Sequence, residues 1–599
     1  MILLFSIYGL ILNTLWCVKP YLFVPKETRV YHEVFKRQSA SLDSELVPLR
    51  RNILEFQNDR VSLSLFLQAL RNLQDKQEKD LYSYFQLAGK LAFYVALSRV
   101  WLISSLGIHG RPYIPWNTGP KTPGAYNTGY CLHNSVLFLP WHRPYLSVVE
   151  NSLIAEAQGI AKGYKNYSTT YQEAANDLRI PYWDWAESPK LPDIATKPKV
   201  EIDTWNGVEF IENPLFQYKF HGGLDPNLFP PDAPDGWFSN FSTTVRGVNT
   251  KNRDEFSHLD RVNDSLQRSN IMANTWRVFV KSKSFNAFST TLTPGLSLEG
   301  IHNNVHGSVG GRYGHMSFLA FSAFDPLFWL HHANIDRLFA LWQAINPDAY
   351  LMPQEDLYGN FIILPHTMVD ENTGLVPFWN QKAGEWWTSA SSRSLSAFSY
   401  TYPELRGNQT PEQLKKNATG AINRLYNPGG IITRRFIKSN EDNLAISSST
   451  TREWSLAISV SKFDLGGSRF KILIFMGGVP SNSEDLEKSS TFIDSVIIFP
   501  PPYNLTMKNL PQIITYSEVN LNDGLRRNGR NVEDVSSVIN YLRTQLEWRV
   551  QRMDSSIVTM EQVPSLNITL QEEMMKIPVD STQLPTYGEK TWHPEAFTS

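Results

Sequence analysis

The chain has 599 residues, of which 42% are hydrophobic and 13% aromatic, and it carries 56 basic against 58 acidic side chains. This length and apolar content exclude wholesale disorder and predict more than one domain around a sizeable core. The nearly balanced charge excludes a basic footprint, so nucleic acid is not expected as a partner. The two cysteines, Cys17 and Cys131, exclude a disulfide-rich scaffold and a cysteine-only zinc site, so a metal centre would need the 13 histidines or carboxylates.

Residues 1–45 are predicted to be a leader, with or without a propeptide. Residues 1–18 are nearly all apolar, as in a signal peptide or a short signal anchor, but a basic start and a clear cleavage site are missing. The alternatives are a buried helix and a wrongly assigned start codon. A working signal would send the protein into the secretory pathway, an anchor would attach it to a membrane, and without either it would be cytoplasmic. Nothing in the sequence indicates an oligomeric state.

The next part of the chain has the pattern of helices joined by long loops. Residues 51–89 carry apolar positions at helical spacing, and residues 327–345 are a second strong helix candidate. Residues 110–130 and 186–260 are rich in Pro, Gly, Asn and Asp, which predicts loops.

A change of period marks a second domain. Trp454, Leu456, Ile458 and Val460 alternate with small or polar residues, which predicts a strand with one buried face. Residues 470–475 and 492–499 are further strand candidates. We therefore predict a mainly α first domain over residues 46–426, a polar linker over residues 427–451 and a smaller β-rich domain over residues 452–599.

Histidines carry the chemical signal, in two clusters. The first cluster is His109, His133 and His142; the second is His302, His306 and the adjacent pair His331 and His332. A spacing of i and i+4, as in His302 and His306, puts two imidazoles on one helix face. Sets made of imidazoles alone suit copper, zinc or iron, and trigonal nitrogen sets suit copper in particular. Successive helix positions differ by about 100°, so we expect only one of His331 and His332 to face a shared metal, with the other packing beside it.

Asp336 and Arg337 follow this pair on the same predicted helix. A carboxylate four residues after His332 could orient an imidazole through its far N–H. The alternative is an ordinary ion pair on a helix surface, and for these two residues taken alone we prefer it.

Several long motifs resemble one family. They are residues 107–110 (GIHG), 131–134 (CLHN), 140–143 (PWHR), 180–185 (IPYWDW), 302–306 (HNNVH) and 324–337 (FDPLFWLHHANIDR). Together they resemble the fungal tyrosinases, which are coupled dinuclear (type 3) copper proteins. The resemblance runs from about residue 47 to residue 426 and includes that family's tyrosine motif at residues 400–403. From about residue 452 the chain is similar to the lid domain of fungal pro-tyrosinases.

The resemblance implies a four-helix bundle that holds two copper ions. Copper A would be bound by His109, His133 and His142, and copper B by His302, His306 and His332. Cys131 matches a cysteine that forms a thioether crosslink with His133; the alternative is a small buried hydrophobic residue. The further residues placed around the site are Phe138, Leu319 at the cavity mouth, Asp325, Phe328, His331, Asp336 and Arg337.

The implied activity uses O2 as co-substrate and small phenols as substrates. Monophenols are hydroxylated at the ortho position and o-diphenols are oxidised to o-quinones, which feeds melanin-type pigment formation. Glu299 matches a glutamate that holds a water near copper B, and Asn303 an asparagine that polarises it; this pair favours monophenolase activity. The alternative for Glu299 is a carboxylate placed at a helix N-terminus by the macrodipole. Rival functions are a catechol or o-aminophenol oxidase without monophenolase activity, and an oxygen carrier, against which the lid and the single-unit length argue.

Two departures from the family complete the predictions. The full-length chain is expected to be latent, although the lid's family Cys-x-x-Cys motif is absent, so copper loading through that motif is not expected. Residues 90–107 form an apolar insert immediately before Ile108 and His109. The insert is either a real addition, such as an extra hydrophobic helix, or, as we prefer, a short intron translated in frame. Because a real insert could displace His109, the chain as written is expected to bind copper A poorly, and would then be a copper-poor inactive homologue.

Overall fold

The computed structural model describes residues 47–97, 100–111, 116, 119–126, 128–165, 168–221, 224, 229, 236–251, 256–427, 449–481, 486–500 and 512–597. Of residues 90–107 it describes the backbone alone. The chain divides into two compact units, residues 1–42 and 43–599, and all described residues belong to the second. The predicted leader and nearly all of the predicted linker therefore lie outside the described residues. None of the described helices is long and apolar enough to cross a membrane.

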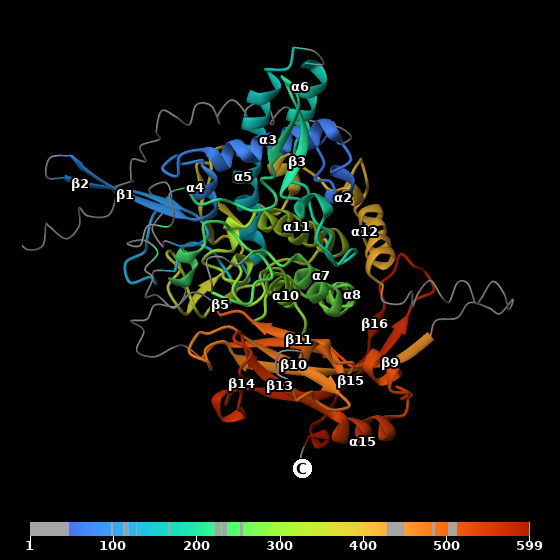
Figure 1. Cartoon of the computed structure of the whole chain (residues 1–599). Helices are drawn as coiled ribbons and strands as arrows, with labels where there is room; N and C mark the ends of the chain where they lie inside the picture. The colour runs from blue at the N-terminus through green and yellow to red at the C-terminus, as the bar shows by residue number, and fades with distance from the viewer. Residues whose placement is uncertain are drawn as a thin grey trace, which may run out of the picture. The chain divides into compact units, whose positions relative to one another are not determined.

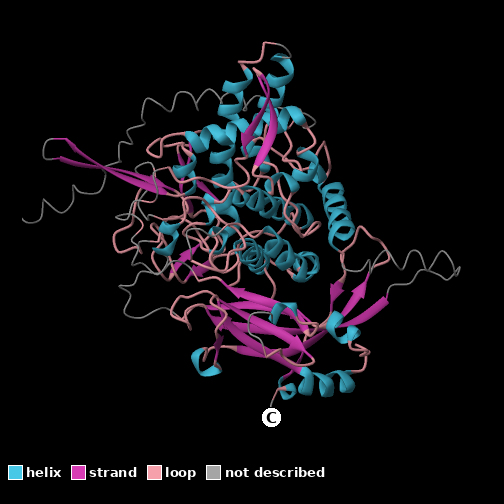
Figure 2. Ribbon diagram, in the orientation of Figure 1, coloured by secondary structure: helices cyan, strands magenta, loops and turns pink. Residues whose placement is uncertain are grey.

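Helices dominate residues 47–427, which we call the helical part (Figures 1 and 2). Its α-helices are α2 (Ile53–Phe56), α3 (Arg60–Asp75), α4 (Tyr84–Ala88), α5 (Phe138–Ala161), α6 (Ser168–Asp177), α7 (Leu259–Arg268), α8 (Ile271–Lys281), α9 (Phe285–Ser289), α10 (Leu298–Gly310), α11 (Leu327–Ile345) and α12 (Pro411–Tyr426). The predicted helix at residues 327–345 is confirmed at both ends. The predicted helical stretch at residues 51–89 is divided into α2, α3 and α4 by capped ends; the Asp59 side chain, for example, accepts a hydrogen bond from the Ser62 N–H at the start of α3.

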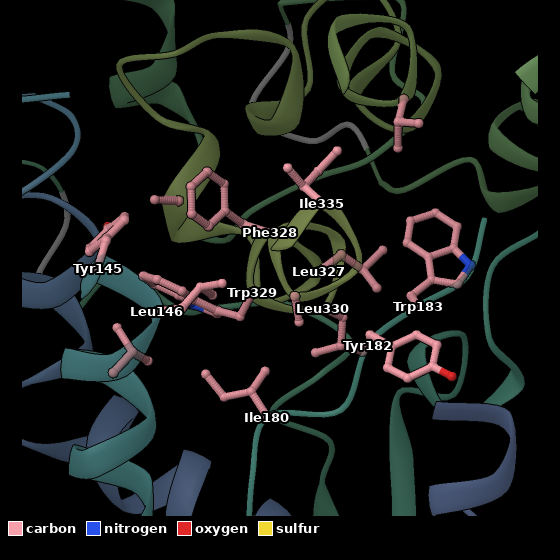
Figure 3. Close-up of a cluster of buried hydrophobic side chains, with 14 of the residues drawn as sticks. Tyr145, Leu146, Ile180, Tyr182, Trp183, Leu327, Phe328, Trp329, Leu330 and Ile335 are labelled. Atoms are coloured by element: carbon pink, nitrogen blue, oxygen red, sulfur yellow. The ribbon is translucent and has the colours of Figure 1, made fainter. Parts of the chain in front are cut away.

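Helices α5 and α11 form the centre of the helical part. Both are buried over most of their length, which explains why α11 is apolar on all sides rather than along one stripe. Figure 3 shows aromatic side chains of the two helices facing one another. The rings of Tyr145 on α5 and Trp329 on α11 lie 5.2 Å apart. The backbone N–H of Trp183, in a loop beside α11, donates to the Leu330 carbonyl at 3.0 Å. This packing fixes the two helices that carry His142, His331 and His332.

The strands of the helical part form separate hairpins. They are β3 (Lys199–Thr204) with β4 (Gly207–Glu212), β5 (Gln354–Asp356) with β6 (Thr367–Val369), and β7 (Gly374–Asn380) with β8 (Glu385–Thr388). The β3–β4 hairpin lies inside residues 186–260, so the prediction of an uninterrupted loop there is wrong. Val200 and Ile202 alternate with exposed neighbours on β3, a period-2 signal hidden among the turn-forming residues.

The insert is a hairpin and not a helix. Strands β1 (Lys90–Leu97) and β2 (Val100–Gly107) pair antiparallel along their whole length, from Lys90 opposite Gly107 to Leu97 opposite Val100. The expectation of an extra hydrophobic helix is therefore wrong. The first and last insert residues are paired, so the chain leaves the helical part and returns to it at neighbouring points. The insert can thus extend outward without moving Ile108 and His109.

Residues 449–597 form two antiparallel sheets, which we call the C-terminal sandwich. One sheet has the order β11 (Phe492–Ile498), β10 (Phe470–Met476), β13 (Leu546–Arg552), β14 (Ile557–Val558). The other has the order β12 (Ile514–Asn520), β9 (Ser449–Ser461), β15 (Asn567–Ile577), β16 (Thr586–Tyr587), with β17 (Thr591–His593) also on β15. Helices α14 (Asn522–Arg527) and α15 (Val535–Gln545) complete it.

The three predicted strands of this part are confirmed. The alternating residues Trp454, Leu456, Ile458 and Val460 of β9 are all buried, in one apolar cluster with side chains of the opposite sheet such as Ile472. An alternating strand buries one face against a second sheet, and that is the arrangement found.

Candidate metal centre

The first histidine cluster is assembled from two loops and one helix. His109 follows the insert hairpin, His133 lies in the loop before α5, and His142 lies on α5. One ligand atom from each of these residues, together with the Cys131 sulfur, falls within 4.8 Å of the others. His109 therefore keeps its place in the cluster despite the insert, which removes the reason to expect poor metal binding there.

The second cluster stands on helices alone. His302 and His306 lie on α10, one turn apart as predicted, and His331 and His332 lie on α11. The Nε2 atoms of His302 and His332 are 3.3 Å apart. His331 also lies within reach, because ligand atoms of all four histidines fall within 4.8 Å of one another. The expectation that helix geometry would turn one member of the pair away is wrong; the two rings both face α10.

The two clusters adjoin. The rings of His142 and His332 stack with centroids 4.5 Å apart, and those of His133 and His302 lie 5.5 Å apart. Two phenylalanines expected around the site are there. Phe138 contacts rings of both clusters, 4.9 Å from His142 and from His302, and Phe328 does so 4.9 Å from His109 and 4.2 Å from His332.

The imidazoles are in the state that metal binding requires. Burial lowers the pKa of all seven clustered histidines, to about 3 for His142 and to about 4 for His306, so the rings are neutral. The Nδ1–H of His142 donates to the Phe138 carbonyl at 2.8 Å, and that of His306 donates to the Met316 carbonyl at 2.7 Å. Nε2 of His306 is then buried without a protein partner. A neutral ring with Nδ1 held and Nε2 free fits a copper ligand.

Cys131 lies against two of these rings. Its sulfur is 3.1 Å from Nδ1 of His133 and 3.7 Å from Nε2 of His142. Burial raises the pKa of its thiol well above the ordinary value, so the sulfur is not an ionised ligand without a metal.

Glu299 and Asn303 flank the second cluster from the first turn and the middle of α10. The Glu299 carboxylate is fully buried and accepts hydrogen bonds from the Asn134 N–H at 2.6 Å, the Thr290 hydroxyl at 2.9 Å and the Thr291 N–H at 2.9 Å. The Asn303 amide oxygen lies 3.0 Å from Nδ1 of His302 and so holds that ring as Met316 holds His306.

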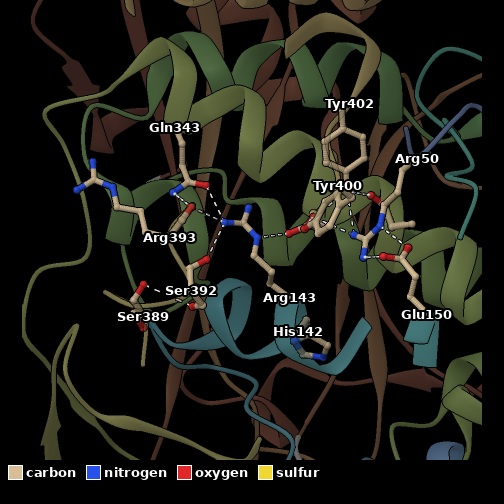
Figure 4. A network of polar contacts seen from close by, with 12 residues as sticks. Arg50, His142, Arg143, Glu150, Gln343, Ser389, Ser392, Arg393, Tyr400 and Tyr402 are labelled. Carbon is tan, nitrogen blue, oxygen red and sulfur yellow. Dashed lines mark hydrogen bonds and ion pairs between the residues drawn. The ribbon is translucent and has the colours of Figure 1, made fainter. Parts of the chain in front are cut away.

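The role suggested for Asp336 is wrong. Its carboxylate accepts from Arg143 at 2.6 Å, from Arg50 at 3.1 Å, and from the hydroxyls of Tyr400 and Tyr402, and not from an imidazole (Figure 4). The alternative of a surface ion pair is also wrong, since all these groups are buried. The network instead fixes α11 against α5, because Asp336 is on α11 and Arg143 on α5.

The two other polar residues predicted near the site also serve α11. Arg337 is buried and pairs with Asp184 at 3.0 Å and with Glu404, and it donates to the Tyr426 hydroxyl at 2.8 Å. Asp325 accepts two hydrogen bonds from Arg246 and caps the Leu327 N–H at 2.9 Å, at the start of α11.

The C-terminal sandwich brings residues that sequence reasoning missed close to the second cluster. Leu319 forms a small apolar cluster with Ile497 and Phe499, and the Phe499 ring lies 6.0 Å from the ring of His306. Lys462 donates to the Asn134 amide oxygen, and Arg469 donates to the Ser317 carbonyl at 2.7 Å. The one sequence signal is the run of prolines after Phe499, which ends β11 at this point.

Comparisons with known proteins agree with this arrangement. The common central domain of tyrosinase matches residues 103–345, and the tyrosinase C-terminal domain matches residues 453–570. The chain is 32% identical over 470 residues to polyphenol oxidase 2 of Agaricus bisporus, covering 75% of this chain and 79% of that relative. It is 35% identical over 404 residues to a tyrosinase of Podospora anserina, covering 63% and 66%.

Solved structures agree as well. A structure of latent and active mushroom tyrosinase has a TM-score of 0.77 at 27% identity, covering 93% of this chain and 99% of that one. A pro-tyrosinase of Aspergillus oryzae shares the fold, with a TM-score of 0.67 at 22% identity over 91% and 95% of the two chains. The chain therefore belongs to the fungal tyrosinase family of copper-dependent oxidases of phenols, with two copper ions as cofactors, O2 as co-substrate and that family's C-terminal domain.

Proposed function

We propose that the protein is a tyrosinase in the full sense, which hydroxylates monophenols at the ortho position and oxidises o-diphenols to o-quinones for melanin-type pigment formation. The proposal is carried by two adjoining sets of buried, neutral imidazoles with Glu299 and Asn303 beside one of them. His109, His133 and His142 would hold one copper, and His302, His306 and His332 the other. The copper pair, when bound, supplies O2 binding and the electrons for its reduction.

The protein's own residues would exclude water from the copper ligands, orient the phenol and accept its proton. A phenol has a pKa near 10, so it needs a base to bind as phenolate near neutral pH. Glu299 is the buried carboxylate next to the second cluster, and Asn303 lines the adjoining cavity, so a water held between them would relay the phenol proton to the Glu299 carboxylate. Phe138 and Phe328 exclude bulk water from the rings.

A second candidate is a catechol oxidase, favoured by one observation. The three close hydrogen bonds to Glu299 all come from Asn134, Thr290 and Thr291, which is what a purely structural carboxylate would show. Turnover of L-tyrosine and of L-DOPA by the copper-loaded enzyme separates the two. Monophenolase activity that falls at least about 10-fold in Glu299→Gln, with diphenolase activity kept, supports the tyrosinase. Diphenolase activity alone in the wild type would establish the catechol oxidase.

Copper stoichiometry tests the ligand assignment. We expect His332→Ala to bind one copper per chain and His331→Ala to bind two. His332 faces both clusters, since its ring stacks on His142 of the first, whereas the clustered rings beside His331 belong to the second alone. The matched pair lies on adjacent positions of α11, both fully buried, so loss of packing is similar. Two coppers in His332→Ala together with one in His331→Ala would reverse the assignment.

We also propose that the full-length chain is latent and that Cys131 is joined to His133. Latency is supported by Phe499, Ile497 and Leu319, which together cover the site. The thioether is supported by the 3.1 Å separation of the Cys131 sulfur and the His133 ring. Forming this C–S bond removes two hydrogen atoms, for which O2 would be the oxidant. Peptide mass spectrometry of the copper-loaded protein tests it: one peptide that contains both Cys131 and His133 and is lighter by two hydrogen atoms is expected, and a Cys131 that alkylates fully after unfolding would contradict it.

A further inference from the structure

Two cations of the C-terminal sandwich are buried against the helical part. Lys462, directly after β9, is 1% exposed, and Arg469, directly before β10, is 6% exposed. Arg469 donates to three carbonyls, those of Ser317, Gly311 and Arg312. Lys462 donates to the Asn134 amide oxygen, and its Nζ lies 3.4 Å from the Phe499 carbonyl. Within the described residues neither cation forms an ion pair with a carboxylate.

Burying an unpaired ammonium group is costly, so the groups that receive Lys462 are informative. Burial lowers the pKa of Lys462 to about 8, and the nearby charge of Glu299 opposes that fall. Asn134 connects the two, because its backbone N–H donates to Glu299 while its side-chain oxygen accepts from Lys462. The Lys462 ammonium group thus contacts the Asn134 amide oxygen, and Asn134 in turn is hydrogen-bonded to the Glu299 carboxylate. Both the amide oxygen and the nearby negative charge favour a bound cation.

Acceptors around Asn134 receive hydrogen bonds from the C-terminal sandwich, although the Asn134 amide oxygen also accepts from the Thr291 hydroxyl at 3.4 Å within the helical part. The Thr291 carbonyl accepts from the Tyr516 N–H at 2.8 Å, and the Asn304 amide oxygen accepts from the Ile497 N–H at 3.3 Å. A narrow cavity lined by Thr291, Asn303 and Lys462 lies beside them. When the sandwich moves away, this side of the site presents oxygens to a ligand, and such a rim attracts a cation and repels a carboxylate.

Phe499 supplies the complementary part. Its ring lies by His306 and Leu319, and its carbonyl lies next to the Lys462 ammonium group. The sandwich therefore places an aromatic ring over the histidines and a cation on Asn134, side by side. An aromatic ring joined to an ammonium group is the chemistry of an aminoalkyl phenol.

We propose that Phe499 and Lys462 together occupy the place of a cationic substrate, and that the Asn134 side-chain oxygen, backed by Glu299, is the subsite for the ammonium group of aminoalkyl phenols. This rests on the proposed function of the same site. It makes Asn134 a specificity-determining residue that favours phenols with a positively charged side arm over neutral or carboxylated ones.

Ligand binding to an opened full-length chain tests the subsite without any reaction. In Lys462→Ala/Phe499→Gly we would titrate phenethylamine, phenethyl alcohol and 3-phenylpropionate, which have no phenolic hydroxyl, by calorimetry. We expect phenethylammonium to bind about 10-fold more tightly than the alcohol, and the carboxylate most weakly. Equal dissociation constants for the three would overturn the proposal.

Asn134 variants, made in the Lys462→Ala/Phe499→Gly chain, test whether Asn134 causes the preference for phenethylammonium. Asn134 has a φ of 55°, so Asn134→Gly keeps the backbone conformation and the N–H to Glu299 while it removes the amide. It should abolish the preference for the cation, and Asn134→Asp should strengthen it. A preference unchanged in both variants would show that another group binds the ammonium.

If the double variant does not fold, the single variant Lys462→Ala still tests the subsite. Lys462→Ala alone vacates the ammonium position under a closed sandwich, so propylammonium should raise its melting temperature and propanol should not. No difference between the two would count against the subsite. Because none of these ligands is oxidised, a chain that binds them as expected but oxidises no phenol would refute the proposed function and leave the subsite standing.

Discussion

The contact between the helical part and the C-terminal sandwich has two unlike ends. At one end, Arg277 and Lys281 of α8 pair with Glu453, Glu518 and Glu573, one carboxylate from each of β9, β12 and β15. At the other end, Lys462 and Arg469 donate hydrogen bonds to neutral oxygens and, among the described residues, form no ion pair with a carboxylate; Phe499 and His306 lie nearby. Removing one partner of a buried ion pair leaves an uncompensated charge and is costly, whereas removing a buried cation that has no paired carboxylate leaves no such charge behind. The first end therefore holds the sandwich by ion pairs, and the second end brings Phe499 next to His306.

The largest effect on activity should come from removing the Phe499 ring at the second end of the contact. Phe499→Gly removes the ring over His306 and leaves the ion pairs of α8 intact. If the uncovered form makes up no more than about a tenth of the wild type, the apparent kcat/KM for L-DOPA should rise about 10-fold or more. Ile497→Val, a small change in the same cluster, is the matched control. Unchanged activity in Phe499→Gly, together with unchanged activity after proteolysis beyond residue 451, would refute latency.

Breaking the first end should cost stability instead. Glu518→Gln leaves Arg277 and Lys281 short of a partner in a buried setting, and we expect a loss of about 3–5 kcal/mol in the free energy of unfolding, measured in urea. Glu212→Gln removes the partner of Lys199 in an exposed pair and should cost less than about 1 kcal/mol. Equal losses in the two variants would mean that the α8 end is no stronger than a surface contact.

Acid should act on the first end in a defined direction. Burial would raise the pKa of Glu453, but Arg277 and Lys281 hold it down to about 2, and the same two cations lower the pKa of Glu518. Their contribution is therefore complete above about pH 4.5 and is lost as the pH falls toward 2. The stability difference between wild type and Glu453→Gln should shrink over that range, and a constant difference would contradict the assignment.

The smallest effect is expected from a change that touches neither end. Deleting residues 90–107 joins Gly89 to Ile108, which already lie at the base of one hairpin. We expect two coppers per chain, as in the wild type, and a melting temperature within a few degrees of it. Loss of copper A in the long form alone would restore the expectation that the insert displaces His109.

The sequence was sufficient where a feature depends on local spacing. His302 and His306 follow from the helix period, α11 begins and ends as its apolar run predicts, and β9 follows from strict alternation. His109 and His133 lie on loops, where no period exists; the sequence grouped them with His142, but only the family resemblance assigned the three to one copper.

Features that depend on distant partners escaped prediction. Asp336 is held by Arg50, 286 residues away, and nothing near Asp336 announces this. Phe499 acquires its role from the docking of two domains. The alternative of a helical insert was wrong because an apolar run without alternation fits a helix and a strand equally well.

The pairing of Lys90 with Gly107 also has a consequence for the gene. A hairpin whose first and last residues are paired can be inserted or deleted as a unit, since the chain before it and the chain after it already lie next to each other. If the segment is an unremoved intron, translation across it still yields a protein with its histidines assembled. Such a splicing lapse would carry little penalty in the folded product, so selection against it would be weak, and long and short forms could persist together in one organism.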